Sequence, residues 1–126
     1  MQLNERWKMI EQIAIGIVAG IVVESIAKKY RIWIYRSTSI QISNIVLVFG
    51  IAAGVVASSI ENYWLMFLLM TLFGYVYELV NISFCHWWRF ENDRIGVIRG
   101  NAAICVALAF VWGVLPVGIA LISGWV

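Results

Sequence analysis

Four long apolar runs constrain the fold of this chain more than any other feature. Each run is close to the roughly twenty residues that a helix needs to cross about 30 Å of hydrocarbon. The charged residues, 13% of the chain against about 25% in soluble domains, lie mostly between the runs. We therefore predict an all-α integral membrane protein. Its four transmembrane helices are expected at about residues 9–27, 40–60, 64–84 and 101–122, after a short interfacial helix over residues 1–12.

The two halves of the chain share a spacing of residues, which indicates an internal repeat. Each half contains a glycine four residues before a glutamate, and a tryptophan follows each glutamate nine residues later. Because each half has two spans, the halves would share one orientation in the membrane. We predict a single membrane domain, 1–126, made of two tandem, same-orientation helical hairpins, 1–60 and 61–126. The matched residues are Gly20 with Gly74, Glu24 with Glu78, Trp33 with Trp87 and, across a three-residue insertion, Asn44 with Asn101.

The basic residues predict the orientation of these helices. An even number of spans places both termini on one side and the connections 28–39 and 85–100 on the other. These connections carry seven of the nine Lys and Arg residues. The positive-inside rule then makes both connections cytoplasmic and both termini external, in a plasma or inner membrane.

Two glutamates lie inside the predicted spans, where an ionisable side chain is costly and usually functional. Glu24 has Lys28 one helical turn away, so an ordinary ion pair near the helix end is the alternative to a functional role. Glu78 has no basic residue one turn away on either side, and the helix dipole disfavours a carboxylate near a helix C-terminus. A protonated Glu78 that is hydrogen-bonded to Asn81, Tyr77 or a neighbouring helix is its structural alternative.

Three asparagines extend the set of candidate ligands. Asn44 lies within a span, where an amide needs a partner such as Glu24. Asn101 follows Gly100, so capping of the fourth helix is its alternative role. The predicted ion- or substrate-binding residues are Glu24, Asn44, Tyr77, Glu78, Asn81 and Asn101.

Small and aromatic residues indicate how the spans pack and where they meet the membrane surface. Glycines four residues apart fall on one face of a helix and let another backbone approach closely. Tryptophans near the ends of spans suit the interface between lipid and water. The predicted helix-packing residues are Gly16, Gly20, Gly50, Gly54 and Gly74, and the predicted interfacial anchors are Trp7, Trp33, Trp87 and Trp88.

Several classes of chemistry find no support in the sequence. Cys85 and His86 are adjacent but belong to no larger cluster of metal ligands, so neither a metal nor a cofactor is expected. Cys85 and Cys105 lie in different contexts and indicate no disulfide framework. No catalytic triad or phosphate-binding glycine loop can be assembled, and most basic residues flank spans, so nucleic-acid binding is not predicted. The expected partners are the lipid bilayer and either further copies of the chain or other membrane subunits.

Three functions of different class remain. We rank first a cation- or proton-coupled transporter or channel that uses the paired glutamates in an oligomer. The second is a non-catalytic accessory or assembly subunit of a larger membrane complex, for which the glycine stripes and tryptophans suffice. The third is a lipid- or isoprenoid-modifying membrane enzyme with the two carboxylates as acid and base. The cost of placing two carboxylates in a membrane decides this order.

Overall fold

The computed structural model of the protein describes residues 3–125, and it is mostly helical. Four helical stretches are long and apolar enough to cross a membrane. The first is α1 (Leu3–Tyr30), and the last is α5 (Asn101–Trp125). The second runs without a break through α2 (Thr38–Ser43), the π-helix η1 (Asn44–Ala52) and α3 (Ala53–Ser59); the third joins α4 (Tyr63–Val80) to the short π-helix η2 (Asn81–Cys85).

The helices lie where the four apolar runs predicted them. α1 is continuous from Leu3, so the described part of the interfacial helix predicted over residues 1–12 is the beginning of α1 and not an element of its own; residues 1 and 2 lie outside the described residues. A short connection separates α3 from α4. In it Asn62 accepts a hydrogen bond from the backbone N–H of Leu65 at 3.2 Å and so caps α4.

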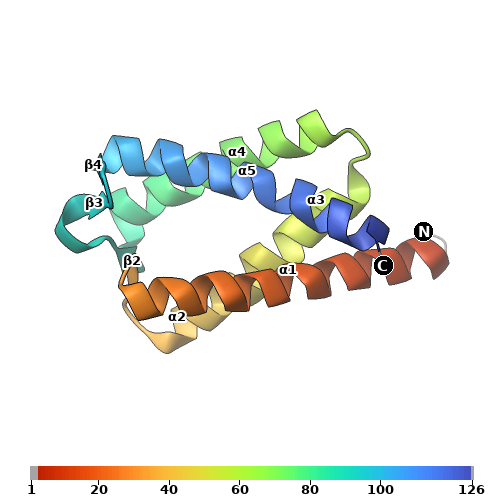
Figure 1. The fold of residues 1–126 in the computed structure, drawn as a ribbon, viewed down its shortest axis with the longest axis horizontal. Coiled ribbons are helices and arrows are strands. Elements are labelled where there is room, and N and C mark those ends of the chain that lie inside the picture. The colour runs from red at the N-terminus through yellow and green to blue at the C-terminus, as the bar shows by residue number, and fades with distance from the viewer. Residues whose placement is uncertain (1–2, 126) are drawn as a thin grey trace.

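The helices pack as two neighbouring pairs. α1 packs against η1 and α3, whereas α4 packs against α5, and α5 also contacts α1 and α3. In Figure 1, α1 runs along the lower side of the molecule, α5 crosses from the upper left toward the lower right, and the β-strands gather at the left end. The beginning of α1 and the end of α5 lie together at the opposite end.

Short strands occupy the two longer connections, and the all-α prediction did not include them. β1 (Ile34–Tyr35) pairs antiparallel with β2 (Trp88–Arg89), placing Tyr35 opposite Trp88. A single 3-10 turn, η3 (Glu91–Asp93), comes next along the chain. Directly after it, β3 (Arg94–Ile95) pairs antiparallel with β4 (Ile98–Arg99). Runs of two residues are too short to show the alternation by which strands are recognised in a sequence. The β1–β2 pair joins the two connections to each other.

An exposed ion pair also joins these connections. The guanidinium of Arg31 lies 3.2 Å from the carboxylate of Glu91. Hydrogen bonding to Arg31 and its positive charge hold the pKa of Glu91 below its ordinary value. Because both groups are in water, this pair contributes little to stability.

Buried residues follow a four-residue spacing along α1 and α4. Residues four apart stack on one face of a helix, so each stripe faces the neighbouring helices. Both candidate glutamates lie on these stripes and are almost completely buried, with exposures of 2% for Glu24 and 3% for Glu78. The stripe on α1 is Gln12, Gly16, Gly20, Glu24 and Ala27; the stripe on α4 is Met66, Met70, Gly74 and Glu78.

The glycines on these stripes and on the second helix permit close backbone contact. A Cβ added at Gly16 would collide with the carbonyl oxygen of Phe49. A Cβ added at Gly20 would lie 2.7 Å from the Phe49 side chain, and one at Gly74 would lie 2.5 Å from the Trp112 side chain. The helices that carry the glutamates, α1 and α4, therefore pack against η1 and α5 too closely at these glycines for a larger residue to fit.

Gly54→Ala is expected to lower the free energy of unfolding by about 1–3 kcal/mol, because overpacking forces backbone or side chains to move. The added Cβ would lie 2.7 Å from the Cα atom of Ile13 on α1, and backbone cannot turn aside. Gly118→Ala is the matched control, since a Cβ there meets nothing within 4 Å and alanine is the better helix former. Unfolding of both variants in mixed detergent micelles measures the difference, and equal stability would contradict this packing.

Candidate functional site

Glu24 accepts hydrogen bonds from three neutral side chains. Its Oε2 accepts from Nε1 of Trp33 at 2.8 Å. Its Oε1 accepts from the hydroxyl of Tyr35 at 2.7 Å and from Nδ2 of Asn44 at 3.1 Å. Trp33 and Tyr35 come from the connection that follows α1, and Asn44 comes from the helix that follows this connection. The carboxylate therefore ties three successive segments of the first half together.

Asn44 links this cluster to the second half of the chain. Besides bonding to Glu24, its Nδ2 donates to the Tyr35 oxygen at 2.8 Å. Its Oδ1 accepts from the hydroxyl of Tyr77 on α4 at 2.5 Å. The partnership of Asn44 with Glu24, which the position of an amide inside a span predicted, is thus present. Tyr77, the residue directly before Glu78, therefore belongs to the same network.

Lys28 is not the partner of Glu24. Within the described part of the chain, neither Glu24 nor Glu78 forms a salt bridge. The side chain of Glu24 turns into the protein, where the indole, phenol and amide donors lie. The ion pair that the four-residue spacing suggested is therefore replaced by hydrogen bonds from uncharged groups.

Glu78 is held by two indoles. Its Oε2 accepts from Nε1 of Trp88 at 3.0 Å, and its Oε1 accepts from Nε1 of Trp112 at 3.1 Å. Trp88 lies on β2 and Trp112 lies on α5, so this carboxylate also ties a connection to two helices. An indole nitrogen can only donate a hydrogen bond. Asn81 and Tyr77, the partners proposed for a structural Glu78, bond elsewhere.

Asn81 positions Trp88 through hydrogen bonds to the backbone. Its Oδ1 accepts from the backbone N–H groups of Trp87 and Trp88 at 2.7 and 3.2 Å, and its Nδ2 donates to the Trp88 carbonyl at 2.9 Å. His86 ends η2 in the left-handed conformation, which turns the chain toward β2. Asn81 is completely buried, and its amide makes the bonds that fix the start of β2.

Trp88, and not Trp87 as the predicted repeat would suggest, donates an indole hydrogen bond to Glu78 as Trp33 does to Glu24. The indole of Trp33 bonds to a glutamate nine positions earlier, whereas that of Trp88 bonds to one ten positions earlier. The π-helix η2 lies in the second interval, and a π turn spans one more residue than an α turn. The indole that reaches Glu78 is therefore one position later than the spacing in the first half predicted.

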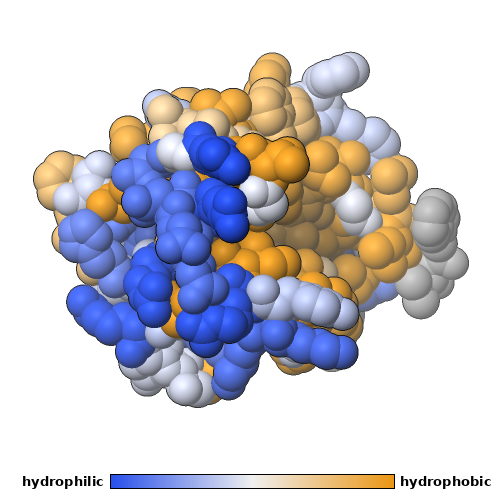
Figure 2. All heavy atoms as spheres, turned by 60° about the vertical axis from the view of Figure 1, so that its left-hand side comes forward, coloured by the Kyte–Doolittle hydropathy of each residue, from blue (hydrophilic) through white to orange (hydrophobic). Residues whose placement is uncertain are grey.

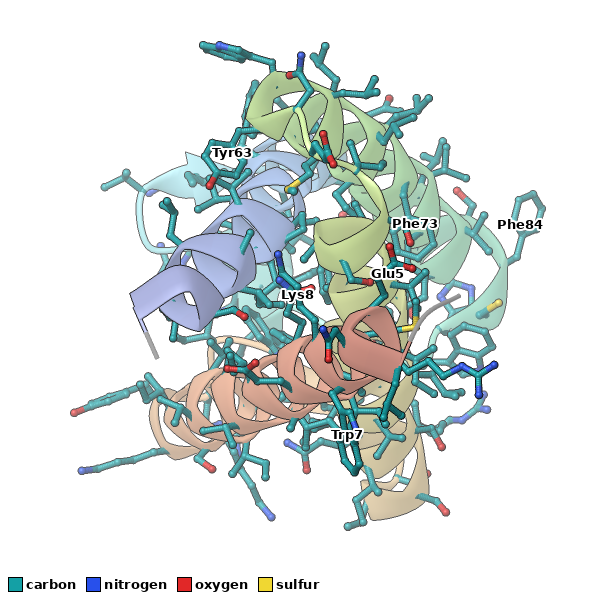
Figure 3. All side chains as sticks on the ribbon, turned by 90° about the vertical axis from the view of Figure 1, so that its right-hand side faces the viewer. Glu5, Trp7, Lys8, Tyr63, Phe73 and Phe84 are labelled. Carbon is teal, nitrogen blue, oxygen red and sulfur yellow. The ribbon has the colours of Figure 1, made fainter. Side chains whose placement is uncertain are left out.

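The four tryptophans predicted as interfacial anchors take different places. Trp33 and Trp88 bond to the glutamates, and Trp88 is only 5% exposed. Trp87 is half-buried against Trp88. Trp7 is 62% exposed, and its side chain extends from the first turns of α1 in Figure 3. Contact of Trp7 with a membrane surface stays a prediction.

Aromatic rings connect the two glutamate clusters. The ring of Tyr77 lies 5.1 Å from that of Trp88 and 5.9 Å from that of Trp112, and Tyr35 lies 5.6 Å from Trp88. Burial of Tyr35, together with the nearby charge of Glu24, raises the pKa of the Tyr35 phenol above its ordinary value. The hydroxyl of Tyr35 therefore remains a hydrogen-bond donor throughout the neutral and mildly alkaline range.

Both carboxylates line one cavity of about 400 Å³. Its walls come from α1, η1, α4, α5 and the two connections, so residues from both halves of the chain meet there. The polar residues of its lining other than tyrosine and tryptophan are Glu24, Asn44 and Glu78, and the aromatic residues are Trp33, Tyr35, Phe49, Trp88, Phe110 and Trp112. The remaining walls are aliphatic, which makes this a hydrophobic cavity with two carboxylates.

The sequence did not single out two members of this site. Tyr35 was assigned to a connection, and Trp112 lies 34 residues from Glu78 within an otherwise ordinary apolar span. No local spacing could have found Trp112, because only the packing of α4 on α5 brings it to Glu78. Asn101 was proposed as the counterpart of Asn44, but it is exposed at the first position of α5. Trp112 fills the equivalent role as the donor from the following helix.

Among residues 3–125, no group of three or more His, Cys, Asp or Glu side chains could hold a metal ion. Comparison of the chain with protein-family models, with curated proteins and with solved structures finds no match. The geometry of the cavity and its two carboxylates is therefore the basis for the function.

Proposed function

We propose that this chain is a cation- or proton-coupled membrane transporter in which Glu24 and Glu78 are the exchange groups. In this proposal the four apolar helices cross the membrane as two hairpins of the same orientation. The connections 28–39 and 85–100 lie in the cytoplasm, and the termini lie outside, as the distribution of basic residues favours. The cavity forms within a single chain, so a second copy is not needed to complete it.

One observation carries this proposal: within residues 3–125, the two buried carboxylates accept hydrogen bonds only from uncharged donors. Burying an ionised group without a partner of opposite charge costs several kcal/mol. Tryptophan, tyrosine and asparagine can orient Glu24 and Glu78, but they carry no positive charge to balance them. The balancing charge must come from outside the chain, as a proton or as a bound cation. Alternation between the two would couple cation movement to proton movement.

The hydrogen bonds leave room for such a ligand at Glu78. A carboxylate offers about four positions at which it can accept a hydrogen bond. The described bonds occupy two positions at Glu78 and three at Glu24. Glu78 also lines the cavity, so its unused positions are within reach of an occupant. We therefore assign Glu78 the larger share of ligand binding and Glu24 the supporting share.

The test is proton flux in proteoliposomes that contain a pH-sensitive dye and an imposed cation gradient. Wild-type protein is expected to acidify or alkalinise the lumen, whereas Glu78→Gln should lose at least about tenfold in rate because its side chain cannot ionise. Glu61→Gln is the control, since Glu61 is exposed in the connection between α3 and α4. Size-exclusion chromatography checks the assembly of each variant. Equal flux in wild type, Glu78→Gln and empty liposomes would contradict the proposal.

An accessory-subunit role is the second candidate, and the same bonds favour it in a different way. Glu24 and Glu78 each tie a connection to two helices, which is what purely structural residues would do. If the protein has this role, proteoliposomes show no proton flux, and purification from native membranes yields a stoichiometric unrelated partner. Flux that depends on Glu78 would rule out this second reading.

A further inference from the structure

We propose that the transported cation is a hydrophobic organic cation, and that it enters the cavity from the lipid through an opening beside α5. Quaternary phosphonium and ammonium ions that carry aromatic or alkyl groups belong to this class. The inference rests on the proposed function and adds the substrate class and the route. Four features of the molecule support it: the size of the cavity, its walls, its opening and the charge of the neighbouring aqueous end.

The size and walls of the cavity fit an organic ion better than a metal ion. Its volume of about 400 Å³ lies in the range of about 300–1,000 Å³ that is typical of small-molecule sites. Indole and phenyl faces attract organic cations, and Trp33, Phe49 and Trp88 are among those that line it. Hard divalent cations take six or more oxygen ligands. The side chains here offer two carboxylates and one amide, and the amide oxygen already accepts from Tyr77.

The opening of the cavity is apolar. The lining residues with the greatest exposure are Phe110, Val111 and Val114, which are 52%, 58% and 58% exposed on α5. Figure 2 shows a hollow with hydrophobic walls beside the hydrophilic end of the molecule. In the membrane orientation proposed above, such an opening faces lipid chains. A hydrophobic ion dissolved in the bilayer can enter the cavity through this opening without first crossing polar side chains.

The aqueous end of the molecule, formed by the connections 28–39 and 85–100, is a poor entrance for a cation. A second cavity of about 400 Å³ lies there, and Lys28, Arg31 and Arg36 are part of its lining. Trp33 and Tyr35 line both cavities, so these two rings separate the basic cavity from the acidic one. Like charges repel a cation at the basic side, whereas the lipid side presents no charge. The electrostatics therefore favour entry from the bilayer.

Binding of tetraphenylphosphonium to the purified protein in detergent tests the substrate class. Tetraphenylborate is the matched probe, because it has nearly the same size and shape and the opposite charge. We expect saturable binding of the phosphonium ion and none of the borate, with binding weakened about a hundredfold in Glu78→Gln through the loss of one nearby charge. Equal binding of both ions would indicate partition into apolar surface only and would overturn the substrate class.

Tryptophan substitutions on α5 test the route. Val111→Trp and Val114→Trp should each block the opening and slow uptake of tetraphenylphosphonium into proteoliposomes at least about tenfold, since a bulky side chain fills the passage. Val106→Trp is the control, because Val106 is also exposed on α5 but does not line the cavity. Uptake that is unchanged in both blocking variants, with assembly intact by size exclusion, would overturn the lateral route.

The two proposals can fail separately. Proton release on addition of sodium chloride, with no binding of tetraphenylphosphonium, would overturn the hydrophobic substrate and leave the transporter proposal standing. Absence of proton release with either cation, together with absence of binding, would overturn both.

Discussion

Glu78→Gln should lower the free energy of unfolding by about 1–3 kcal/mol, the cost of one unsatisfied buried polar group. Both oxygens of Glu78 accept from indole nitrogens, Nε1 of Trp88 and Nε1 of Trp112. A glutamine has one carbonyl oxygen, so it can satisfy one indole, and its NH₂ group then faces the N–H of the other. The isosteric substitution is therefore not neutral here, even if the glutamate serves structure alone.

A second substitution should relieve this conflict. Trp112→Phe removes one of the two N–H donors, so the glutamine oxygen can accept from Trp88 while its NH₂ group no longer meets a donor. In a double-mutant cycle the two changes are expected to couple favourably by about 1–3 kcal/mol. Trp88→Phe should couple in the same way, because the glutamine amide can rotate so that its oxygen accepts from Nε1 of Trp112.

Unfolding in mixed detergent micelles measures the four corners of this cycle. Trp64→Phe is the control for the aromatic change, since Trp64 is 75% exposed. It should show no coupling with Glu78→Gln, because distant independent sites add. Coupling near zero for both Trp112→Phe and Trp88→Phe would contradict the assignment of these indoles as the donors to Glu78.

Asn44→Asp should be the most damaging single change of one atom in this protein, at about 3–5 kcal/mol of stability, the cost of an unpaired buried charge. Nδ2 of Asn44 donates both to Oε1 of Glu24 and to the Tyr35 oxygen. Aspartate replaces this donor by an acceptor and sets a second carboxylate against Glu24. Tyr35 and Glu24 would both lose a donor at the same time.

Asn62→Asp makes the same chemical change where it should do no harm. Asn62 caps α4 by accepting from the backbone N–H of Leu65, and aspartate is an equally good residue at this position. Unfolding of the two variants under one condition gives the comparison. Similar stability of Asn44→Asp and Asn62→Asp would show that the network around Glu24 contributes little.

The sequence predicted the helices and the glutamates for reasons that are local. A run of about twenty apolar residues has few other uses, and the four-residue spacing places Glu24 and Glu78 on the stripes that each helix buries. The need of Asn44 for a partner within a span also led to Glu24. Each of these inferences depends on neighbours along one helix or on the composition of one segment.

The donors to the glutamates could not be predicted in the same way, because they depend on how separate segments pack. Trp88 donates to Glu78 in place of Trp87, which the nine-residue spacing had indicated, and a short π-helix, which has no clear signature in sequence, lies between Glu78 and Trp88. Trp112 reaches Glu78 only through the packing of α5 on α4. Tryptophan near the end of a span commonly lies at the membrane surface, and for Trp33 and Trp88 that general tendency concealed a specific hydrogen bond.

The most direct test of the central claim is an infrared difference spectrum of the purified protein recorded before and after addition of a cation. A protonated carboxyl group and a carboxylate absorb at different frequencies, so the spectrum reports whether the glutamates exchange a proton for the cation. With tetraphenylphosphonium, we expect loss of the protonated carboxyl band in wild-type protein and in Glu61→Gln, and sodium serves as the comparison with a small inorganic cation. The band change should be smaller in Glu24→Gln and absent in Glu78→Gln. Identical difference spectra for wild type and Glu78→Gln with both cations would contradict the assignment of Glu78 as the exchange group.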